Sequence, residues 1–174
     1  MKKPLVIIIN GVGGVGKDTI CDIVGKYYKT KVVSTITDVK KAGSLIGWQG
    51  SKSLKDRGFL SDLKDLCTEY YDYPFKKAVS DYESFLNTHD DILFIHVREP
   101  QEINKLQLYI KKDGRADVCT LLIKSDRFSQ SYGNHADDDV ELYNYDYIFN
   151  NNCSIEELED NFMDFFKGGI LNEW

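Results

Sequence analysis

Short apolar runs alternate with amphipathic segments along most of the chain. The runs cover residues Leu5–Asn10, Lys31–Ile36, Asp91–Val97, Val118–Lys124 and Tyr145–Asn150. Three of them are almost continuously apolar, which is typical of parallel strands that are covered on both faces. The pattern therefore predicts five strands of one parallel sheet.

Between these runs, apolar residues recur at helical spacing in four stripes. The stripes are Ile20, Ile23, Val24 and Tyr27; Phe59, Leu63, Leu66, Cys67 and Tyr70; Tyr82, Phe85 and Leu86; and Ile155, Leu158, Phe162, Phe165 and Phe166. Ser154 and Glu157 have the spacing of a capping box at the start of the last helix, and Gly168-Gly169 is expected to end that helix. Alternating strands and helices predict an α/β protein, a five-stranded parallel sheet flanked by helices.

The length of 174 residues fits a single domain, residues 1–174. The chain shows no repeat and no Pro/Gly/Ser-rich linker that would divide it. A long helical insert, about 38–90, separates the second and third strands and is expected to overhang the sheet. A shorter polar segment, about 125–139, follows the fourth strand.

Charge, apolar run length and cysteine spacing exclude several classes of protein. The net charge of −6 argues against a general nucleic-acid coat, which is expected to be basic. The longest unbroken apolar run, Leu5–Ile9, is too short for a membrane span or a signal-peptide core. The 4 cysteines form no C-x-x-C pair and fit a reducing cytoplasm.

The glycine-rich stretch GVGGVGKDT, residues 11–19, follows the first strand directly and opens a helix. It fits the P-loop pattern G-x-x-x-x-G-K, in which successive backbone N–H groups turn inward around a phosphate. Lys17 would meet the β- and γ-phosphates, and the helix adds the positive end of its dipole. The residues assigned to the nucleotide are Gly11, Gly13, Gly14, Val15, Gly16, Lys17, Asp18 and Thr19.

The residues after the lysine depart from the usual P-loop pattern. Asp18 stands where serine or threonine is common, and the hydroxyl comes one place later, at Thr19. Thr19 is therefore the expected metal ligand. The carboxylate of Asp18 must point away from the phosphates or act on the water shell of the metal.

The same stretch also satisfies the dinucleotide pattern G-x-G-x-x-G, through Gly11, Gly13 and Gly16. Asp38 stands at about the distance expected for a carboxylate that binds a ribose. Lys17 favours the P-loop, because a dinucleotide site has no use for a lysine directly after the third glycine.

The stretch GVGGVGKDT resembles the loop of nucleoside and deoxynucleoside monophosphate kinases. Further segments, STITDVKKAGSLIGW, KDRGFLSDLKDL and FIHVREPQEI, resemble phage and bacterial deoxynucleoside monophosphate kinase-like proteins. The C-terminal YDYIFNNNCSIEELEDNF is also similar to phosphomevalonate kinase and dephospho-coenzyme A kinase. The resemblance implies a P-loop NTPase fold with an acceptor-binding insert and a short lid, and a kinase that uses ATP and Mg²⁺.

Related kinases bind the phosphoryl acceptor with the insert, which here carries Lys40, Lys52 and Arg57. Asp38 should lie at the carboxyl edge of the sheet, where it would orient the acceptor or a metal-bound water, or cap a helix. Arg98 directly follows the third strand and is expected to hold the acceptor. Arg57 would clamp the phosphate of the acceptor, or pair with a neighbouring carboxylate on the surface.

The resemblance assigns three further residues to the nucleotide. Lys124 and Arg127 belong to the lid that would close over the γ-phosphate, and Asn151 follows the last strand at the adenine pocket. Related kinases often have an acid where this chain has His96, which is interpreted as a packed strand-end histidine. The aromatic cluster Tyr70, Tyr71, Tyr73 and Phe75 is a candidate platform for a base, although core packing is preferred.

The expected function is that of a cytoplasmic kinase that transfers the γ-phosphoryl group of ATP to a nucleoside or deoxynucleoside monophosphate. The alternative within this class is a dephospho-coenzyme A or phosphomevalonate-type kinase. An ATP-binding protein without enzymatic activity and an NAD-dependent oxidoreductase are the alternatives from other classes. The expected partner is a small-molecule acceptor, with neither a nucleic acid polymer nor a membrane, and the oligomeric state stays open.

Overall fold

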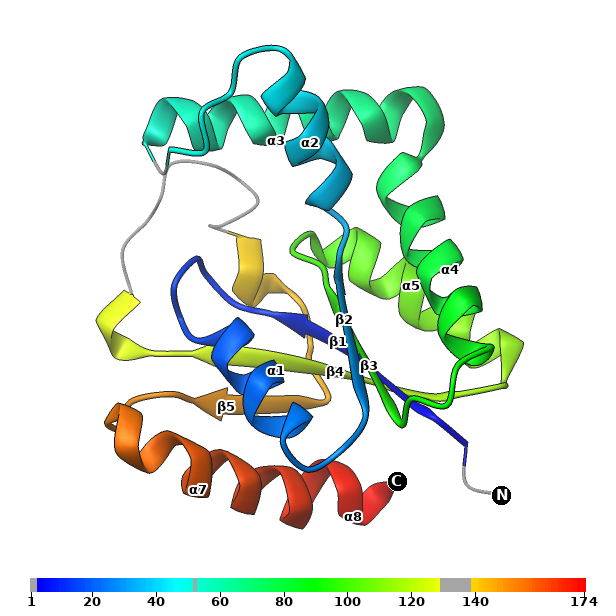
Figure 1. Ribbon diagram of the computed structural model, residues 1–174, viewed down its shortest axis with the longest axis vertical. Helices are drawn as coiled ribbons and strands as arrows, with labels where there is room; N and C mark the ends of the chain where they lie inside the picture. Colours follow the sequence, from blue (N-terminus) through cyan, green and yellow to red (C-terminus); the bar gives the residue numbers. More distant parts are fainter. Residues whose placement is uncertain (1–2, 52, 129–138) are drawn as a thin grey trace.

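The computed structural model describes residues 3–51, 53–128 and 139–174, and within them a five-stranded sheet. The strands are β1 (Leu5–Asn10), β2 (Thr30–Ser34), β3 (Ile92–His96), β4 (Asp117–Lys124) and β5 (Tyr147–Asn150). Their order is β2-β3-β1-β4-β5, and every neighbouring pair is parallel (Figure 1). The prediction of a five-stranded parallel sheet is confirmed.

Helices cover both faces of the sheet and its carboxyl edge. They are α1 (Lys17–Gly25), α2 (Thr37–Leu45), α3 (Leu54–Tyr71), α4 (Tyr73–Leu86), α5 (Pro100–Asp113), α7 (Ile155–Phe165) and α8 (Leu171–Glu173). Short 3₁₀ turns follow β4 (η1, Asp126–Phe128) and precede β5 (η2, Asp139–Leu142). Within the described residues, no helix has the length and apolar character needed to cross a membrane.

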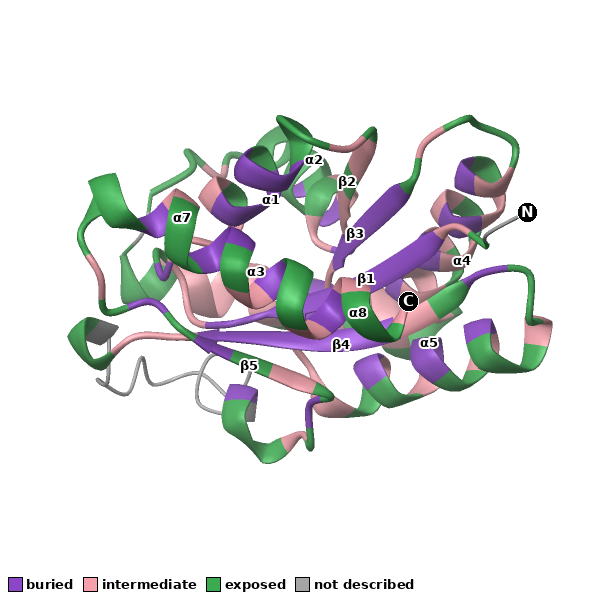
Figure 2. Ribbon diagram, turned by 90° about the horizontal axis from the view of Figure 1, so that it is seen from below, coloured by how far each residue is buried: buried purple, intermediate pink, exposed green. Residues whose placement is uncertain are grey.

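The central strand β1 divides the core into two halves. Its odd-numbered residues, such as Ile7 and Ile9, pack with α1 and α7, whereas Val6 and Ile8 pack with α4 and α5. This division follows from the alternation of side chains along a strand. β1 is buried along its whole length, while the edge strands β2 and β5 are partly exposed (Figure 2). Each fully buried aliphatic side chain contributes about 1.5–3 kcal/mol, which explains why β1 is apolar on both faces.

The insert between β2 and β3 consists of α2, α3 and α4, and α2 and α3 lie beyond the carboxyl ends of the strands (Figure 1). Ser53 caps α3 by accepting a hydrogen bond from the backbone N–H of Asp56 at 3.2 Å. Lys64, in the middle of α3, is 5% exposed and forms an ion pair with Glu99, which follows β3. The pair therefore anchors the insert to the edge of the sheet.

Two predicted apolar stripes do not match the buried surface. On α3, Leu66 is 61% exposed and Tyr70 is 87% exposed, and of its residues only Lys64 is fully buried. The prediction was wrong here because α3 lies across the edge of the sheet, where polar groups meet it, and does not cover an apolar face. Tyr27, predicted to belong to the first stripe, lies past the end of α1 and is 53% exposed.

The C-terminal helix begins as predicted but does not end as predicted. Ser154 and Glu157 form the complete capping box at the start of α7. Gly168-Gly169 does not end the helical segment, since a π-helical turn, Phe166–Ile170, leads into α8. Phe166 and Ile170 are both buried against the sheet, and this packing outweighs the low helix propensity of two glycines.

Candidate active site

The loop after β1, residues 11–16, is called the glycine loop here, and it connects β1 to α1 by a tight turn. Gly11 has a φ of 144°, and a Cβ atom at this position would lie 2.4 Å from the carbonyl oxygen of Ile123 in β4. Gly16 has a φ of 105°, and its Cβ atom would lie 2.7 Å from Nδ2 of Asn151. Both positions therefore need glycine for conformation and for space.

Lys17 points back into the glycine loop. Its ammonium group donates hydrogen bonds to the carbonyl oxygens of Gly11 and Val12, the latter at 2.9 Å. The amine is held at the first turn of α1, where the positive end of the helix dipole favours an anion. The loop, the lysine and the helix end thus form a positively charged cradle at the carboxyl edge of the sheet, and its use as an anion site stays a prediction.

Asn151 closes the cradle from the side of β5. Its side-chain amide donates to the carbonyl oxygen of Val15 at 2.8 Å, and its backbone N–H donates to Lys124 O at 2.7 Å. The residue is 7% exposed. Sequence reasoning assigned Asn151 to the adenine pocket and missed its contact with the glycine loop. The adenine assignment stays a prediction.

His96 lies beside α1 at the end of β3. Its Nε2 atom is 3.6 Å from Sγ of Cys21 and 3.9 Å from Oδ1 of Asp18. Burial lowers the pKa of His96 to about 4, the charge of Asp18 opposes this shift, and the charges of Lys17, Arg98 and Lys40 add to it. The imidazole is therefore neutral at pH 7. Its packing against Cys21 agrees with the interpretation of His96 as a strand-end core residue.

Asp38 and Lys40 lie on α2, and Arg98 follows β3. The charges of Lys40 and Arg98 act on His96 and lower its pKa. Asp38 accepts hydrogen bonds from Lys41 and from the hydroxyl of Tyr73, each at 2.9 Å. These bonds lower the pKa of Asp38. In this structure Asp38 therefore secures α2 to α4, and its catalytic role stays a prediction.

Of the two predicted arginines of the acceptor site, Arg57 lies over the glycine loop and Arg98 is held by its backbone at the end of β1. The guanidinium of Arg57, in the first turn of α3, lies over Gly13, whose Cβ atom would be 3.5 Å from its nearest nitrogen. The backbone of Arg98 is held in place, because Asn10 Nδ2 donates to its carbonyl oxygen at 2.8 Å. The structure thus brings residues separated by 88 positions, Asn10 and Arg98, to one edge of the sheet.

Lys124 and Arg127, the two cations assigned to the lid, have protein partners. Lys124 pairs with Glu141 at 2.7 Å. Arg127 donates to the carbonyl oxygens of Asn151 and Cys153, each at 3.2 Å, so its guanidinium lies against the loop between β5 and α7. The remainder of the predicted lid, 129–138, and Lys52 of the insert lie outside the described residues.

Sequence reasoning missed a series of buried hydrogen bonds beneath the glycine loop. Asn10 is fully buried, accepts from the N–H of Gly11 at 2.8 Å and bonds the hydroxyl of Tyr145 at 2.7 Å. Tyr145 donates in turn to Val140 O at 2.7 Å. Buried polar groups need such partners. The signal in the sequence was an asparagine at the end of an otherwise apolar strand, directly before the first glycine.

The strand order distinguishes between the two folds that the glycine pattern allows. In the dinucleotide fold the second strand pairs with the first, giving the order 3-2-1-4-5-6. Here β3 lies between β1 and β2, and Lys17 points into the glycine loop. The chain has the P-loop NTPase fold. The strand order therefore does not support the dinucleotide alternative, in which Asp38 would bind a ribose.

Solved structures share this fold along almost the whole chain. A provisionally assigned kinase from Chloroflexus aurantiacus superposes with a TM-score of 0.58 at 11% identity, covering 99% of this chain and 98% of that one. Shikimate kinase from Bacteroides thetaiotaomicron gives 0.52 at 11% identity, covering 98% and 99%. Shikimate kinase from Aquifex aeolicus gives 0.50 at 11%, covering 95% and 98%. No protein-family model matches the sequence, and no curated protein does.

The groups at the glycine loop suit a nucleotide with its metal. The ammonium of Lys17 and the N-terminal end of α1 offer positive charge for phosphates. Across the described ranges, no group of three or more His, Cys, Asp and Glu side chains could hold a metal ion alone. Mg²⁺ is commonly held by substrate phosphates and one or two protein oxygens, and Asp18 and Thr19 offer such oxygens beside Lys17.

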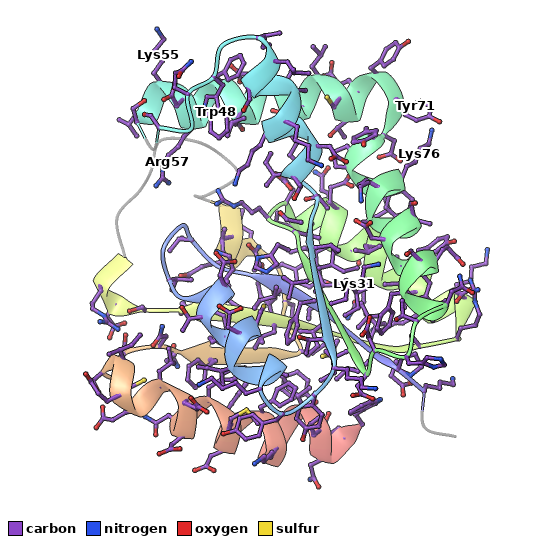
Figure 3. The ribbon with its side chains drawn as sticks, in the orientation of Figure 1. Lys31, Trp48, Lys55, Arg57, Tyr71 and Lys76 are labelled. Atoms are coloured by element: carbon purple, nitrogen blue, oxygen red, sulfur yellow. The ribbon has the colours of Figure 1, made fainter. Side chains whose placement is uncertain are left out.

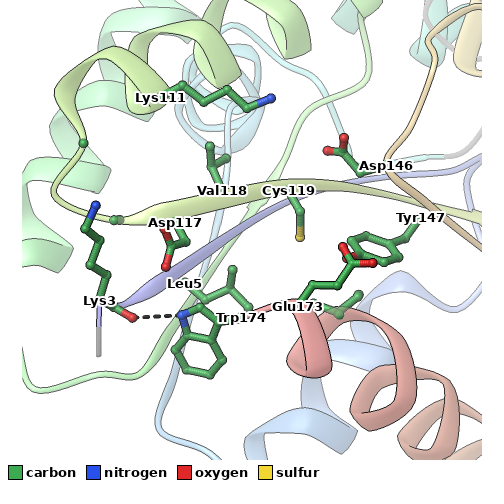
Figure 4. Close-up of a pocket in the computed structure, with 13 residues that line it drawn as sticks. Lys3, Leu5, Lys111, Asp117, Val118, Cys119, Asp146, Tyr147, Glu173 and Trp174 are labelled. Atoms are coloured by element: carbon green, nitrogen blue, oxygen red, sulfur yellow. Dashed lines mark hydrogen bonds between the residues drawn. The ribbon is translucent and has the colours of Figure 1, made fainter. Parts of the chain in front are cut away.

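A cavity of about 390 Å³ lies at the other edge of the sheet, where the parallel strands begin (Figure 4). Leu5, Asp117 and Tyr147, the first residues of β1, β4 and β5, line it together with Trp174. The indole N–H of Trp174 donates to Lys3 O at 2.9 Å and holds the C-terminal helix there. Because ligands of open α/β sheets bind at the carboxyl edge, this cavity is separate from the candidate active site.

Proposed function

We propose that the protein is an ATP-dependent kinase that transfers the γ-phosphoryl group to a small acceptor, a nucleoside or deoxynucleoside monophosphate. The observation that carries the proposal is the ammonium of Lys17, held inside a glycine cradle at the first turn of α1. Phosphoryl transfer needs positioning and positive charge more than covalent chemistry, and this arrangement offers both. The shikimate kinases that share the fold support the kinase class.

Most of the predicted site residues have a part in this proposal. The glycine loop and Lys17 bind the phosphates of ATP, with Asn151 and Arg127 on the side of β5. Thr19 binds Mg²⁺, which would neutralise charge on the phosphates when bound. The remaining cations are assigned to the acceptor or the lid: Lys40, Lys52, Arg57, Arg98 and Lys124.

The position of the insert supports a phosphorylated acceptor. Lys40 on α2 and Arg98 after β3 are both close enough to His96 for their charges to lower its pKa. A neutral acceptor needs no second cluster of cations, whereas a monophosphate does. Dephospho-coenzyme A and phosphomevalonate also carry phosphate groups, so they remain the alternatives within this class.

The test of the function is a coupled assay of ADP release with ATP and Mg²⁺. The acceptors to compare are the nucleoside and deoxynucleoside monophosphates, dephospho-coenzyme A and phosphomevalonate. We expect release with one or a few of the monophosphates. Release with none of the acceptors, at protein concentrations that bind ATP stoichiometrically, would favour an ATP-binding protein without kinase activity.

Binding of ATP in preference to NAD is the first expected outcome. A ligand that binds only the folded state raises stability by about 2.7 kcal/mol at 100 times its Kd, which is about 5–10 °C in Tm for a chain of this size. ATP with Mg²⁺ should give such a shift in a thermal-unfolding scan. NAD should give none, and a shift with NAD alone would contradict the P-loop assignment.

Replacement of Arg98 with alanine should weaken binding of the acceptor and leave ATP affinity nearly unchanged. The backbone of Arg98 is fixed by Asn10, the last residue of β1, which directly precedes the glycine loop. A bidentate contact between a guanidinium and a phosphate contributes about 1.5–3 kcal/mol, so we expect KM for the acceptor to rise about 10- to 100-fold. Arg98→Lys should recover part of the loss, because an ammonium lacks the planar fork.

Steady-state kinetics with ATP and acceptor varied separately measure this effect. Arg115→Ala is the matched control, because Arg115 pairs with Asp113 and Glu83 at the turn before β4, away from the cradle. The control should keep both KM values. An Arg98→Ala variant with unchanged acceptor KM and kcat would remove Arg98 from the site.

A further inference from the structure

Arg57 lies over the donor side of the candidate active site. The two terminal nitrogens of its guanidinium are 3.5 and 3.6 Å from the position that a Cβ atom would take on Gly13. Figure 3 shows the side chain of Arg57 pointing from α3 toward the glycine loop, whereas Lys55, in the same turn of α3, points away from it. The glycine loop is the part of the site that faces the β- and γ-phosphates. Arg57 is therefore placed to contact the phosphates of ATP, and not the acceptor alone.

The fold holds Arg57 in this direction. Lys64 lies seven residues further along α3, and residues seven apart share a face of a helix. The ammonium of Lys64 is buried and paired with Glu99, in the loop that follows β3. The ion pair sets the rotation of α3 about its axis, and the same face then carries Arg57 over the glycine loop.

Two other cations assigned to the phosphates are directed elsewhere in this structure. Lys124 is engaged by Glu141, and Arg127 lies against backbone carbonyls between β5 and α7. Among the described residues of the insert, Arg57 is thus the cation that lies directly over Gly13 of the glycine loop.

We propose that Arg57 binds the γ-phosphoryl group of ATP, so that the insert supplies a cation to the group being transferred. The inference rests on the proposed kinase function. In the transfer, a bond forms between an acceptor phosphate oxygen and the γ-phosphorus. The bond from that phosphorus to the bridging oxygen breaks, and its electron pair stays on ADP. Arg57 exchanges no proton and stabilises the negative charge on the equatorial oxygens.

The test compares a non-hydrolysable ATP analogue with ADP by titration calorimetry, with Mg²⁺ present and without any acceptor. Arg57→Ala should weaken binding of the analogue about 10- to 100-fold, the range of a charge-assisted contact, and change ADP affinity by no more than about twofold. Arg57→Lys should lose part of the analogue affinity and keep the ADP affinity, because it retains the charge and lacks the fork. Lys55→Ala is the matched control, and it should bind both nucleotides like the wild type.

The remaining outcomes overturn the inference. Unchanged binding of the analogue together with a raised acceptor KM would place Arg57 on the acceptor only. An equal loss for the analogue and ADP would indicate a general disturbance of the glycine loop. Should Arg57→Ala fail to fold, the ratio of the two affinities in Arg57→Lys decides, since that variant keeps the stem and the charge. A wild type that binds neither nucleotide would contradict the proposed function itself, which separates the two failures.

Discussion

Replacement of Lys17 with alanine is expected to lower kcat by about 10³-fold or more while the fold is retained. The ammonium lies inside the glycine loop, where it donates to the backbone carbonyls of Gly11 and Val12. When ATP binds, this charge would meet the β- and γ-phosphates, whose negative charge changes most during transfer. Removing one preorganised donor at such a position commonly costs 10²- to 10³-fold, and here a full charge is lost with it.

The measurement is kcat with ATP and the acceptor found in the ADP-release screen, with circular dichroism as the check on folding. Lys26→Ala serves as control, because Lys26 lies at the other end of α1 and pairs with Glu159 on the surface. We expect the control to keep its turnover. If Lys17→Ala kept most of its kcat, the amine would serve only the carbonyls of the loop, and the kinase proposal would lose its main support.

The sheet could be predicted from the sequence because its strands are buried on both faces. β1 begins and ends at the predicted residues, Leu5 and Asn10, and the other four strands differ from the prediction by one or two residues at an end. The strand order could not be predicted, because it depends on how the crossover helices pack and leaves no local pattern in the sequence. That order then decided between two ligands that the glycine pattern allows.

The insert was predicted as helical but not in its orientation. A stripe of apolar residues on α3 predicts an inward face, yet Tyr70 and Leu66 point outward and Lys64 is buried. The inward face of α3 is held to the sheet by the ion pair of Lys64 with Glu99, a residue 35 positions away. Hydrophobic periodicity carries no information on such a pair. The tyrosines Tyr70 and Tyr71, which were preferred as core residues, are both exposed.

The candidate site was predictable where one continuous segment builds it. Residues 11–19 fold as the pattern indicates because strand, turn and helix follow each other directly. The contacts across the sequence were not predictable in the same way. Asn151 reaches Val15 over 136 positions, and Arg57 reaches Gly13 from another helix. Residue type indicated that these side chains were candidates, and only the packing of the insert and of β5 brings them to the glycine loop.

Replacement of Gly11 with alanine should destabilise the protein by about 2–5 kcal/mol and abolish the ATP-induced rise in Tm. At a φ of 144° an L-residue is strained, and its Cβ atom would meet Ile123 O at 2.4 Å and Val15 Cγ1 at 2.9 Å. Ile123 belongs to β4, which pairs with β1 and β5 on either side, so its carbonyl cannot move aside. Backbone strain and overpacking each contribute about 1–3 kcal/mol, and both act at this position.

Gly13→Ala is the matched control for Gly11→Ala. Gly13 does not have a positive φ, and the atoms nearest to its Cβ atom would be the flexible end of Arg57, at 3.5 Å or more. Its effect on the free energy of unfolding should stay within about 0.5 kcal/mol, the usual range away from strained or packed positions. Urea unfolding, with the slope m held equal, measures both variants. Equal losses would contradict a special steric constraint at Gly11. A loss confined to Gly11→Ala would show that the first glycine is required because the loop passes so close to β4.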